Sequence, residues 1–317
     1  MSDNSLTRRD FVAASAAGAV ALTLRQPGTR LPDPPMPERP LGRTGHRVRL
    51  FSLGGQATLE RAGRHDDAVA IINRAIDLGV NYIDTAAAYG RGISQIYIGD
   101  VMKTRRNEVF LATKTHDRTR DGSLRLLDDS LRKLQTDHLD LWQLHNITSR
   151  GDLDRIFGKN GALEAMDRAR DQKMVRFLGI TGHYDPDLLI EGLRRFAFDT
   201  VLMALNAADA HHLPFTKALL PLANERRIGV IAMKIPARGR LFRAGGITTM
   251  RDAMRYTLSH PVSTVIVGCD TVAQLEENVA IAKSFEPLHP AEMARLEGLT
   301  AGYAEDAAFF KRGNAGF

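Results

Sequence analysis

The sequence contains a single cysteine, Cys269, among 317 residues. One cysteine excludes an intrachain disulfide and any metal or cluster site built from several thiolates. A lone cysteine usually behaves as a small buried apolar side chain, and we expect this of Cys269. After residue 40 no run of 18 or more apolar residues occurs, so we expect no helix that spans a bilayer in that part of the chain.

A strong charge bias is also lacking. The formal net charge is +6, and the first 50 residues, with eight arginines and four acidic residues, hold most of the surplus. The other 267 residues are nearly balanced in charge, so no nucleic-acid partner is expected. An apolar fraction of 44% over this length is sufficient for one large core.

The first 35 residues have the pattern of a targeting signal followed by a linker. The pair Arg8-Arg9 precedes Asp10, Phe11 and a short small-residue apolar run over 12–24, and 25–40 is rich in Pro and Arg. This layout resembles the twin-arginine export signal of bacteria. The resemblance implies export to the periplasm by the twin-arginine machinery, with membrane contact only through an uncleaved N-terminal segment. The alternative is a chance Arg-Arg pair before an Ala-rich helix, which leaves the protein in the cytoplasm.

From residue 36 onward the chain alternates short apolar runs with amphipathic ones. Strands are predicted at 48–53, 81–84, 109–113, 139–144, 177–180, 200–204, 229–233 and 264–267. Helices are predicted at 66–78, 121–134, 161–172, 186–196, 216–226, 250–259 and 271–284. We expect Asp121, Asp185, Thr249 and Asp270 to cap helices.

Eight such alternations predict an α/β protein of the (β/α)8 TIM-barrel class, formed by residues 36–317 as a single domain. A doubly wound open sheet is the alternative fold. That alternative is disfavoured because no G-x-G-x-x-G occurs anywhere in the sequence.

Four residues that can carry protons or charge stand at the ends of consecutive predicted strands: Asp84, Tyr89, Lys114 and His145. In a barrel these strand ends share one mouth, so we expect the four side chains to meet. A carbonyl that accepts a hydride becomes an alkoxide and must receive a proton. We predict Tyr89 as acid/base, Lys114 as the cation that lowers the pKa of Tyr89, Asp84 as the counter-charge, and His145 as the group that positions the carbonyl.

Each of the four also has an ordinary structural interpretation. Asp84 could be a cap, Tyr89 a packing residue, Lys114 a solvated side chain and His145 a core histidine. Their joint occurrence at strand ends favours the functional interpretation.

At this point the chain resembles the aldo-keto reductase family. The matching pieces run from Leu41-Gly42-Arg43-Thr44-Gly45, through the segments around Asp84–Tyr89, Lys114 and His145, to Glu276-Glu277-Asn278. The resemblance implies a nicotinamide cofactor, NADPH with NADH possible, bound across the barrel mouth, a small carbonyl compound as substrate, and no metal.

The resemblance also implies a set of cofactor-binding residues: Gly55, Gln56, Thr181, Asn206, Met233, Lys234, Gly239, Gly268, Gln274, Glu277 and Asn278. Thr181 and Asn206 stand near positions that hold the carboxamide in the family, where Gly182 departs from the pattern. Gln274 replaces an arginine that clamps the 2′-phosphate, and Arg238 and Arg240 could compensate. Residues 287–317 contain no cysteine, and their aromatic residues either close over the mouth or pack as a terminal helix.

Two other functions stay open at this stage. A metal-dependent barrel enzyme could use Asp209, His211 and His212, with His116 and His183 on other mouth loops. The same barrel could instead be a catalytically weak sensor or auxiliary subunit that binds the cofactor, because fold alone does not fix function.

Overall fold

The computed structural model describes residues 34–311, and the described residues from Pro35 onward form one compact unit. The predicted export segment therefore lies outside the described residues, apart from its last two positions. Among residues 34–311 no helix combines the length and apolar character that crossing a bilayer requires.

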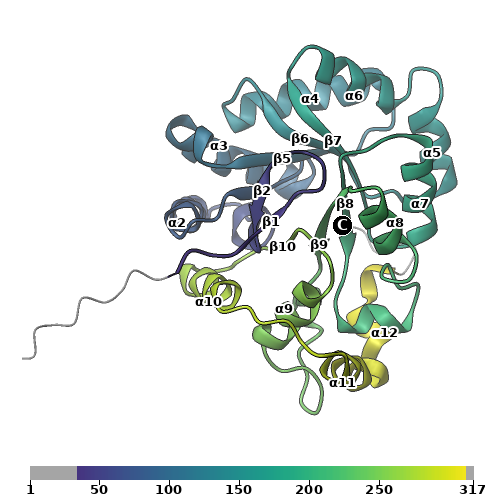
Figure 1. Ribbon diagram of the computed structural model, residues 1–317. Coiled ribbons are helices and arrows are strands. Elements are labelled where there is room, and N and C mark those ends of the chain that lie inside the picture. The colour runs from purple at the N-terminus through teal and green to yellow at the C-terminus, as the bar shows by residue number, and fades with distance from the viewer. Residues whose placement is uncertain (1–33, 312–317) are drawn as a thin grey trace, which may run out of the picture. The chain divides into compact units, whose positions relative to one another are not determined.

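Eight parallel strands close into a barrel in the order β10-β3-β4-β5-β6-β7-β8-β9. Their bounds are β3 Phe51–Gly54, β4 Tyr82–Asp84, β5 Phe110–Thr115, β6 Leu139–Leu144, β7 Val175–Gly182, β8 Thr200–Ala204, β9 Gly229–Met233 and β10 Thr264–Val267. Helices form an outer ring around the strands (Figure 1). The predicted (β/α)8 barrel is thus confirmed.

The ring of helices has more members than the sequence predicted. The longer ones are α2 His65–Asp77, α3 Ile93–Arg105, α4 Arg120–Leu134, α5 Arg150–Phe157, α6 Ala162–Asp171, α7 Pro186–Arg195, α8 Leu219–Glu225, α9 Met250–Ser259, α10 Val272–Lys283 and α11 Pro290–Thr300. The sequence patterns did not predict α3, α5 and α11. In α3 the buried face includes Ser94, Gln95 and Gly99, so its apolar periodicity is weak.

A small hairpin precedes the barrel. β1 (Glu38–Pro40) pairs antiparallel with β2 (Arg47–Arg49), so the predicted strand at 48–53 is two separate elements. Leu41 and Val48 are fully buried against apolar side chains of the barrel interior such as Tyr82 and Leu141. Val48 is therefore apolar because it packs across one end of the barrel, and not because it belongs to the first barrel strand.

Two of the four predicted caps are confirmed and two are wrong. Asp185 and Thr249 cap α7 and α9. Thr119, not Asp121, caps α4, and Thr271, not Asp270, caps α10. In each wrong case the hydroxyl of a neighbouring threonine accepts the free backbone N–H instead.

The C-terminal segment is fixed to the loop that follows β8. Lys311 is almost fully buried, pairs with the carboxylate of Asp209, and donates to the backbone oxygens of His212 and Leu213 at 2.6 and 2.7 Å. Phe310 is buried in the core, whereas Phe317 lies outside the described residues. The described part of this segment is packed structure beside η4 (Ala207–His211), a short 3-10 helix that follows the carboxyl end of β8.

Candidate active site

Asp84, Lys114 and Tyr89 meet at the carboxyl ends of β4 and β5. Asp84 is the last residue of β4, and Lys114 lies near the end of the adjacent β5. The ammonium of Lys114 pairs with the Asp84 carboxylate and donates to the backbone oxygen of Thr85 at 2.8 Å. The same ammonium lies 3.4 Å from the hydroxyl of Tyr89. Three of the four predicted chemical residues therefore form one contiguous group.

The lysine and the aspartate are both almost fully buried. Lys114 is 1% exposed and Asp84 2%. Burial alone lowers the pKa of Lys114, but Asp84 and Tyr89 outweigh it and raise the pKa above its usual value. Gln143 donates to the other carboxylate oxygen of Asp84 at 3.1 Å. These contacts hold a permanent cation beside the phenol.

The backbone after Tyr89 takes a sharp course. Gly90, Arg91 and Gly92 all have positive φ, at 56°, 56° and 95°. A Cβ at Gly90 would lie 2.2 Å from the backbone oxygen of Glu60, so only glycine fits there. This turn fixes the backbone position from which the Tyr89 side chain extends.

The pKa of Tyr89 moves in the direction opposite to the one predicted. Burial raises the pKa above its ordinary value, and the nearby Lys114 ammonium offsets only part of this rise. The prediction of a net lowering is therefore wrong, because desolvation of the phenolate outweighs the single cation. At neutral pH Tyr89 is a protonated phenol, which is a proton donor.

His145 completes the group from the end of β6. Its ring meets the Tyr89 ring edge-on, with centroids 5.6 Å apart. Burial, followed by the charge of Lys114, lowers the pKa of His145 well below its ordinary value. A neutral imidazole beside the phenol can donate or accept a hydrogen bond without adding charge.

A groove of about 790 Å³ opens beside Asp84 and Tyr89. This volume lies within the usual range for small-molecule and cofactor sites. The groove is lined by nine of the residues predicted to bind the cofactor, namely Gly55, Gln56, Met233, Lys234, Gly239, Gly268, Gln274, Glu277 and Asn278. Two of the four predicted chemical residues, Asp84 and Tyr89, thus line the same cavity as most of the predicted cofactor residues.

Thr181 and Asn206 do not line this groove, although both were predicted to bind the cofactor. Both are fully buried. The hydroxyl of Thr181 accepts from the backbone N–H of Asn146 at 2.7 Å. The Asn206 side chain accepts from Ala208 N and donates to Lys234 O, each at 2.9 Å. Backbone groups therefore occupy both polar ends of the Asn206 amide.

Several groove residues were not predicted from the sequence. Glu60 ends η1 (Ala57–Glu60) and Arg61 follows it, and Phe242, Thr248 and Thr249 come from the long segment before α9. Gln143 was part of the matched segment around His145, but its contact with Asp84 was not foreseen. A polar residue two positions before a candidate histidine on a strand points to the same side, and this spacing could have signalled it.

The cations near the groove differ in their surroundings. Burial, followed by the charge of Arg238, lowers the pKa of Lys234 to about 7. Arg238 lines the groove. Arg240 instead pairs with Asp306 at 3.1 Å and lies over the Phe309 ring. Of the two arginines expected to compensate for Gln274, only Arg238 faces the cavity.

The residues of the metal alternative have other partners. Asp209 pairs with Lys311, and His211 bonds through Nε2 with the backbone oxygen of Glu297 at 2.8 Å. Within residues 34–311 no group of three His, Cys, Asp or Glu side chains has the geometry of a metal site. Cys269 is buried, as predicted, and burial raises the pKa of its thiol to about 12.

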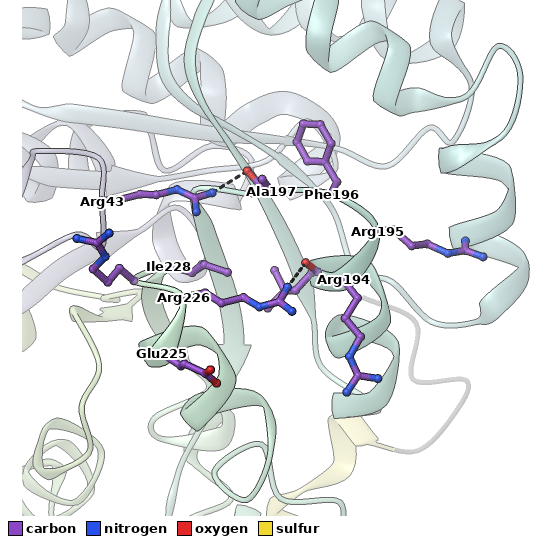
Figure 2. A pocket seen from close by; sticks show the side chains of 10 residues that line it. Arg43, Arg194, Arg195, Phe196, Ala197, Glu225, Arg226 and Ile228 are labelled. Carbon is purple, nitrogen blue, oxygen red and sulfur yellow. Dashed lines mark hydrogen bonds between the residues drawn. The ribbon is translucent and has the colours of Figure 1, made fainter.

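A second hollow, of about 420 Å³, lies near the amino ends of β8 and β9, away from these groups. Five arginines line it: Arg43, Arg194, Arg195, Arg226 and Arg227. Figure 2 shows Arg43 and Arg226 bonded to backbone carbonyls, with Arg194 and Arg195 turned outward. The arginines do not converge on one point, and two of them serve to hold backbone turns together.

Known proteins resemble this chain along most of its length. Residues 51–249 match the model of the aldo/keto reductase family. L-galactose dehydrogenase of Arabidopsis thaliana is 29% identical over 288 residues, which cover 79% of this chain and 89% of the relative. The holo form of the aldo-keto reductase AKR11C1 from Bacillus halodurans superposes with a TM-score of 0.72 at 26% identity, over 83% of this chain and 96% of that one.

A third likeness concerns the fold alone. An aldo-keto reductase from Klebsiella pneumoniae, solved in complex with NADPH, is 22% identical and has a TM-score of 0.71 over 83% of this chain and 95% of its own. The family match covers well over half of the sequence and includes Asp84, Tyr89, Lys114 and His145. The chain is a member of the aldo/keto reductase family of oxidoreductases.

Proposed function

We propose that the protein reduces the carbonyl group of an aldehyde or ketone with NADPH, and that Tyr89 supplies the proton. The observation that carries this proposal is the contact between the Lys114 ammonium and the Tyr89 hydroxyl at the rim of the groove. When bound, the nicotinamide supplies the hydride to the carbonyl carbon.

The residues of the site transfer the proton and stabilise the charges that form. The Tyr89 phenol donates to the carbonyl oxygen and passes its proton as the alkoxide forms. Lys114 stabilises the resulting phenolate, and Asp84 keeps Lys114 charged. His145, neutral and buried, offers a second hydrogen bond to the same oxygen. No metal is needed in this scheme.

The groove fits a nicotinamide dinucleotide. A Cβ at Gly55 would lie 2.5 Å from Ser94 Oγ, and one at Gly268 would lie 3.1 Å from the backbone oxygen of Gln56. Both glycines line the groove, and neighbouring atoms of the chain leave little room for a side chain at either position. We propose that Lys234 and Arg238 attract the phosphates and that Glu277 and Asn278 contact the adenine side. The Klebsiella protein shows that this fold accommodates NADPH.

Single-turnover kinetics test the proposal. Purified protein is loaded with NADPH and mixed with a panel of aldehydes and ketones, and loss of nicotinamide absorbance is followed. We expect at least one carbonyl to react, and Tyr89→Phe to slow the reaction by about 10²- to 10⁴-fold. If no member of the panel reacts although NADPH binds, the protein is better described as a cofactor-binding sensor or auxiliary subunit.

We also propose that Arg8-Arg9 directs export of the folded protein by the twin-arginine route, on the strength of the sequence pattern alone. Fractionation of cells that produce the full chain tests this. We expect the protein outside the cytoplasmic membrane, and in the cytoplasm when both arginines are replaced by lysine. Cytoplasmic location of the unaltered chain contradicts the proposal.

A further inference from the structure

Glu60 carries a carboxylate on the wall of the groove, and the reaction scheme leaves it without a role. It is half-buried and lines the groove together with Gln56 and Tyr89. Its own short helix, η1, packs against η2 (Tyr89–Gly92), the turn that begins with the proposed proton donor. A Cβ at Gly90 would lie 2.2 Å from the backbone oxygen of Glu60, so the two turns are in direct contact. The backbone thus holds Glu60 beside the residue that must reach the substrate carbonyl.

The carboxylate of Glu60 is only weakly engaged by its neighbours. Gln56 Nε2 lies 3.5 Å from Oε1 of Glu60, which is a long hydrogen bond. The adjacent Arg61 pairs with Asp270 at 3.0 Å instead. Within residues 34–311 no Lys, Arg or His side chain lies within 4 Å of the Glu60 carboxylate oxygens as an ion-pair partner. Glu60 therefore keeps a charge and acceptor capacity that a ligand in the groove can use.

The charge of Glu60 acts across the cavity. Burial is the main cause of the raised pKa of Tyr89, and the Glu60 charge adds to that rise. Burial, followed by the charge of Arg238, lowers the pKa of Lys234, and the Glu60 charge opposes this lowering. Tyr89 and Lys234 both line the groove, so a group placed between them also lies within the electrostatic reach of Glu60.

A carboxylate repels phosphate, so Glu60 is unsuited to binding the phosphates of the cofactor. Lys234 and Arg238, which we propose to attract those phosphates, are cations of the same groove. Bound phosphates offset the charge of these two cations, whereas the negative charge of Glu60 stays uncompensated. The substrate must bring its carbonyl to the Tyr89 hydroxyl, so its remaining groups lie close enough to Glu60 for their charge to matter.

We propose that Glu60 selects substrates by charge: it favours carbonyl compounds that bear a cationic group and disfavours those that bear a carboxylate. This inference rests on the proposed function, because it presumes that the groove holds NADPH and that the carbonyl is reduced beside Tyr89. Glu60 is then a specificity-determining residue and takes no part in the transfer of the proton or the hydride.

Three benzaldehydes that differ in the charge of one para substituent test the inference. The substituents are trimethylammonio, which is cationic, tert-butyl, which has the same shape without charge, and carboxylate. With saturating NADPH, kcat/KM is measured for the unaltered protein, Glu60→Gln and Glu60→Lys, and calorimetry gives the Kd for NADPH. Glu286→Gln is the matched control, because it makes the same change at an exposed residue between α10 and α11, outside the groove lining.

The quantity compared is the ratio of kcat/KM for the cationic aldehyde to that for the anionic one, because differences in intrinsic reactivity cancel between proteins. Glu60→Gln should lower this ratio roughly tenfold, since each charged aldehyde loses one partly screened interaction. Glu60→Lys should lower it further. For Glu60→Gln, kcat/KM for the tert-butyl compound and the Kd for NADPH should stay close to those of the unaltered protein. Glu286→Gln should leave every value unchanged.

Two results overturn the inference. One is a ratio that is the same in the unaltered protein and in Glu60→Gln. The other is an equal loss of kcat/KM for all three aldehydes together with weaker NADPH binding, which would show that Glu60 acts on the cofactor or on the fold. Failure of the unaltered protein to reduce any of the aldehydes although it binds NADPH would instead contradict the proposed function, so the two failures are distinguishable.

Discussion

The ammonium nitrogen of Lys114 lies 3.4 Å from the hydroxyl oxygen of Tyr89, a residue that lines the groove. Because Lys114 also pairs with buried Asp84, its charge persists at neutral pH. A phenolate formed at Tyr89 during turnover therefore finds a cation already in place.

Replacing Tyr89 by Phe should lower kcat for carbonyl reduction by about 10²- to 10⁴-fold, because the alkoxide loses its proton donor. The Kd for NADPH should change little, since the hydroxyl is not required for binding. Stopped-flow absorbance and calorimetry measure the two quantities. Tyr256→Phe is the matched control: its hydroxyl bonds to Glu297 on α11, so its loss should affect stability and not kcat. Full activity in Tyr89→Phe contradicts the assigned role.

Lys114→Met should destabilise the fold by about 3–5 kcal/mol, because it leaves the buried Asp84 carboxylate without its counter-charge. The double variant Lys114→Met/Asp84→Leu should recover most of this loss while staying inactive. Urea unfolding measures the stability. A single variant as stable as the unaltered protein would show that the pair is not buried in solution.

The pH dependence should follow from the raised pKa of Tyr89. Reduction needs the protonated phenol, so kcat/KM should stay level from neutral pH to about 10, the ordinary value, and fall only above it. Oxidation of the alcohol needs the phenolate, so its rate should rise with pH above about 10. The pH–rate profiles of reduction and of oxidation check the direction of the Tyr89 pKa shift. A reduction profile that already falls near pH 8 would indicate that the charge of Lys114 outweighs burial and lowers the net pKa of Tyr89.

The charge of Lys234 should make cofactor binding sensitive to pH. Its ammonium is present below its pKa of about 7 and lost above, and a bound phosphate moves this transition upward. We expect the Kd for NADH to rise by roughly fivefold between pH 6.5 and 9.5, an effect of one partly screened charge. Lys234→Met should bind NADH at every pH as weakly as the unaltered protein does at pH 9.5. An unchanged pH dependence in this variant would exclude Lys234 as its source.

Gln274→Arg should increase the preference for NADPH over NADH by roughly tenfold, because a guanidinium can clamp the 2′-phosphate. Gln274 accepts from the backbone N–H of Asp270 at 2.8 Å, on the wall of the groove. Gln274→Met keeps the length without the charge and serves as control. The ratio of Kd values for the two reduced cofactors is the measurement.

The barrel and the four chemical residues could be predicted because they depend on local patterns and on one topological rule. Buried parallel strands read as short apolar runs, and their carboxyl ends share a mouth, which places Asp84, Lys114 and His145 together. The role of Val48 in closing the barrel could not be predicted in this way. An apolar residue next to a strand has the same signature whether it extends that strand or packs across its end.

Electrostatics and side-chain partners were harder to predict. The sequence shows that a lysine lies near Tyr89, but the sign of the pKa shift depends on how much water reaches the phenol. Likewise, Thr181 and Asn206 were assigned to the cofactor by position, while the structure gives their polar atoms to neighbouring backbone groups. Which partner a polar atom bonds to depends on packing across the barrel, and the spacing of residues along the sequence does not show it.

The pairing of Lys311 with Asp209 has a consequence for how the mouth is assembled. Asp209 sits in the loop after β8, whereas Lys311 comes about a hundred residues later. On the ribosome, the barrel strands and this loop emerge well before the lysine that neutralises the buried carboxylate. The mouth therefore takes its final shape only after nearly the whole chain has been made, and removal of the residues from Lys311 onward would leave the loop with an uncompensated charge.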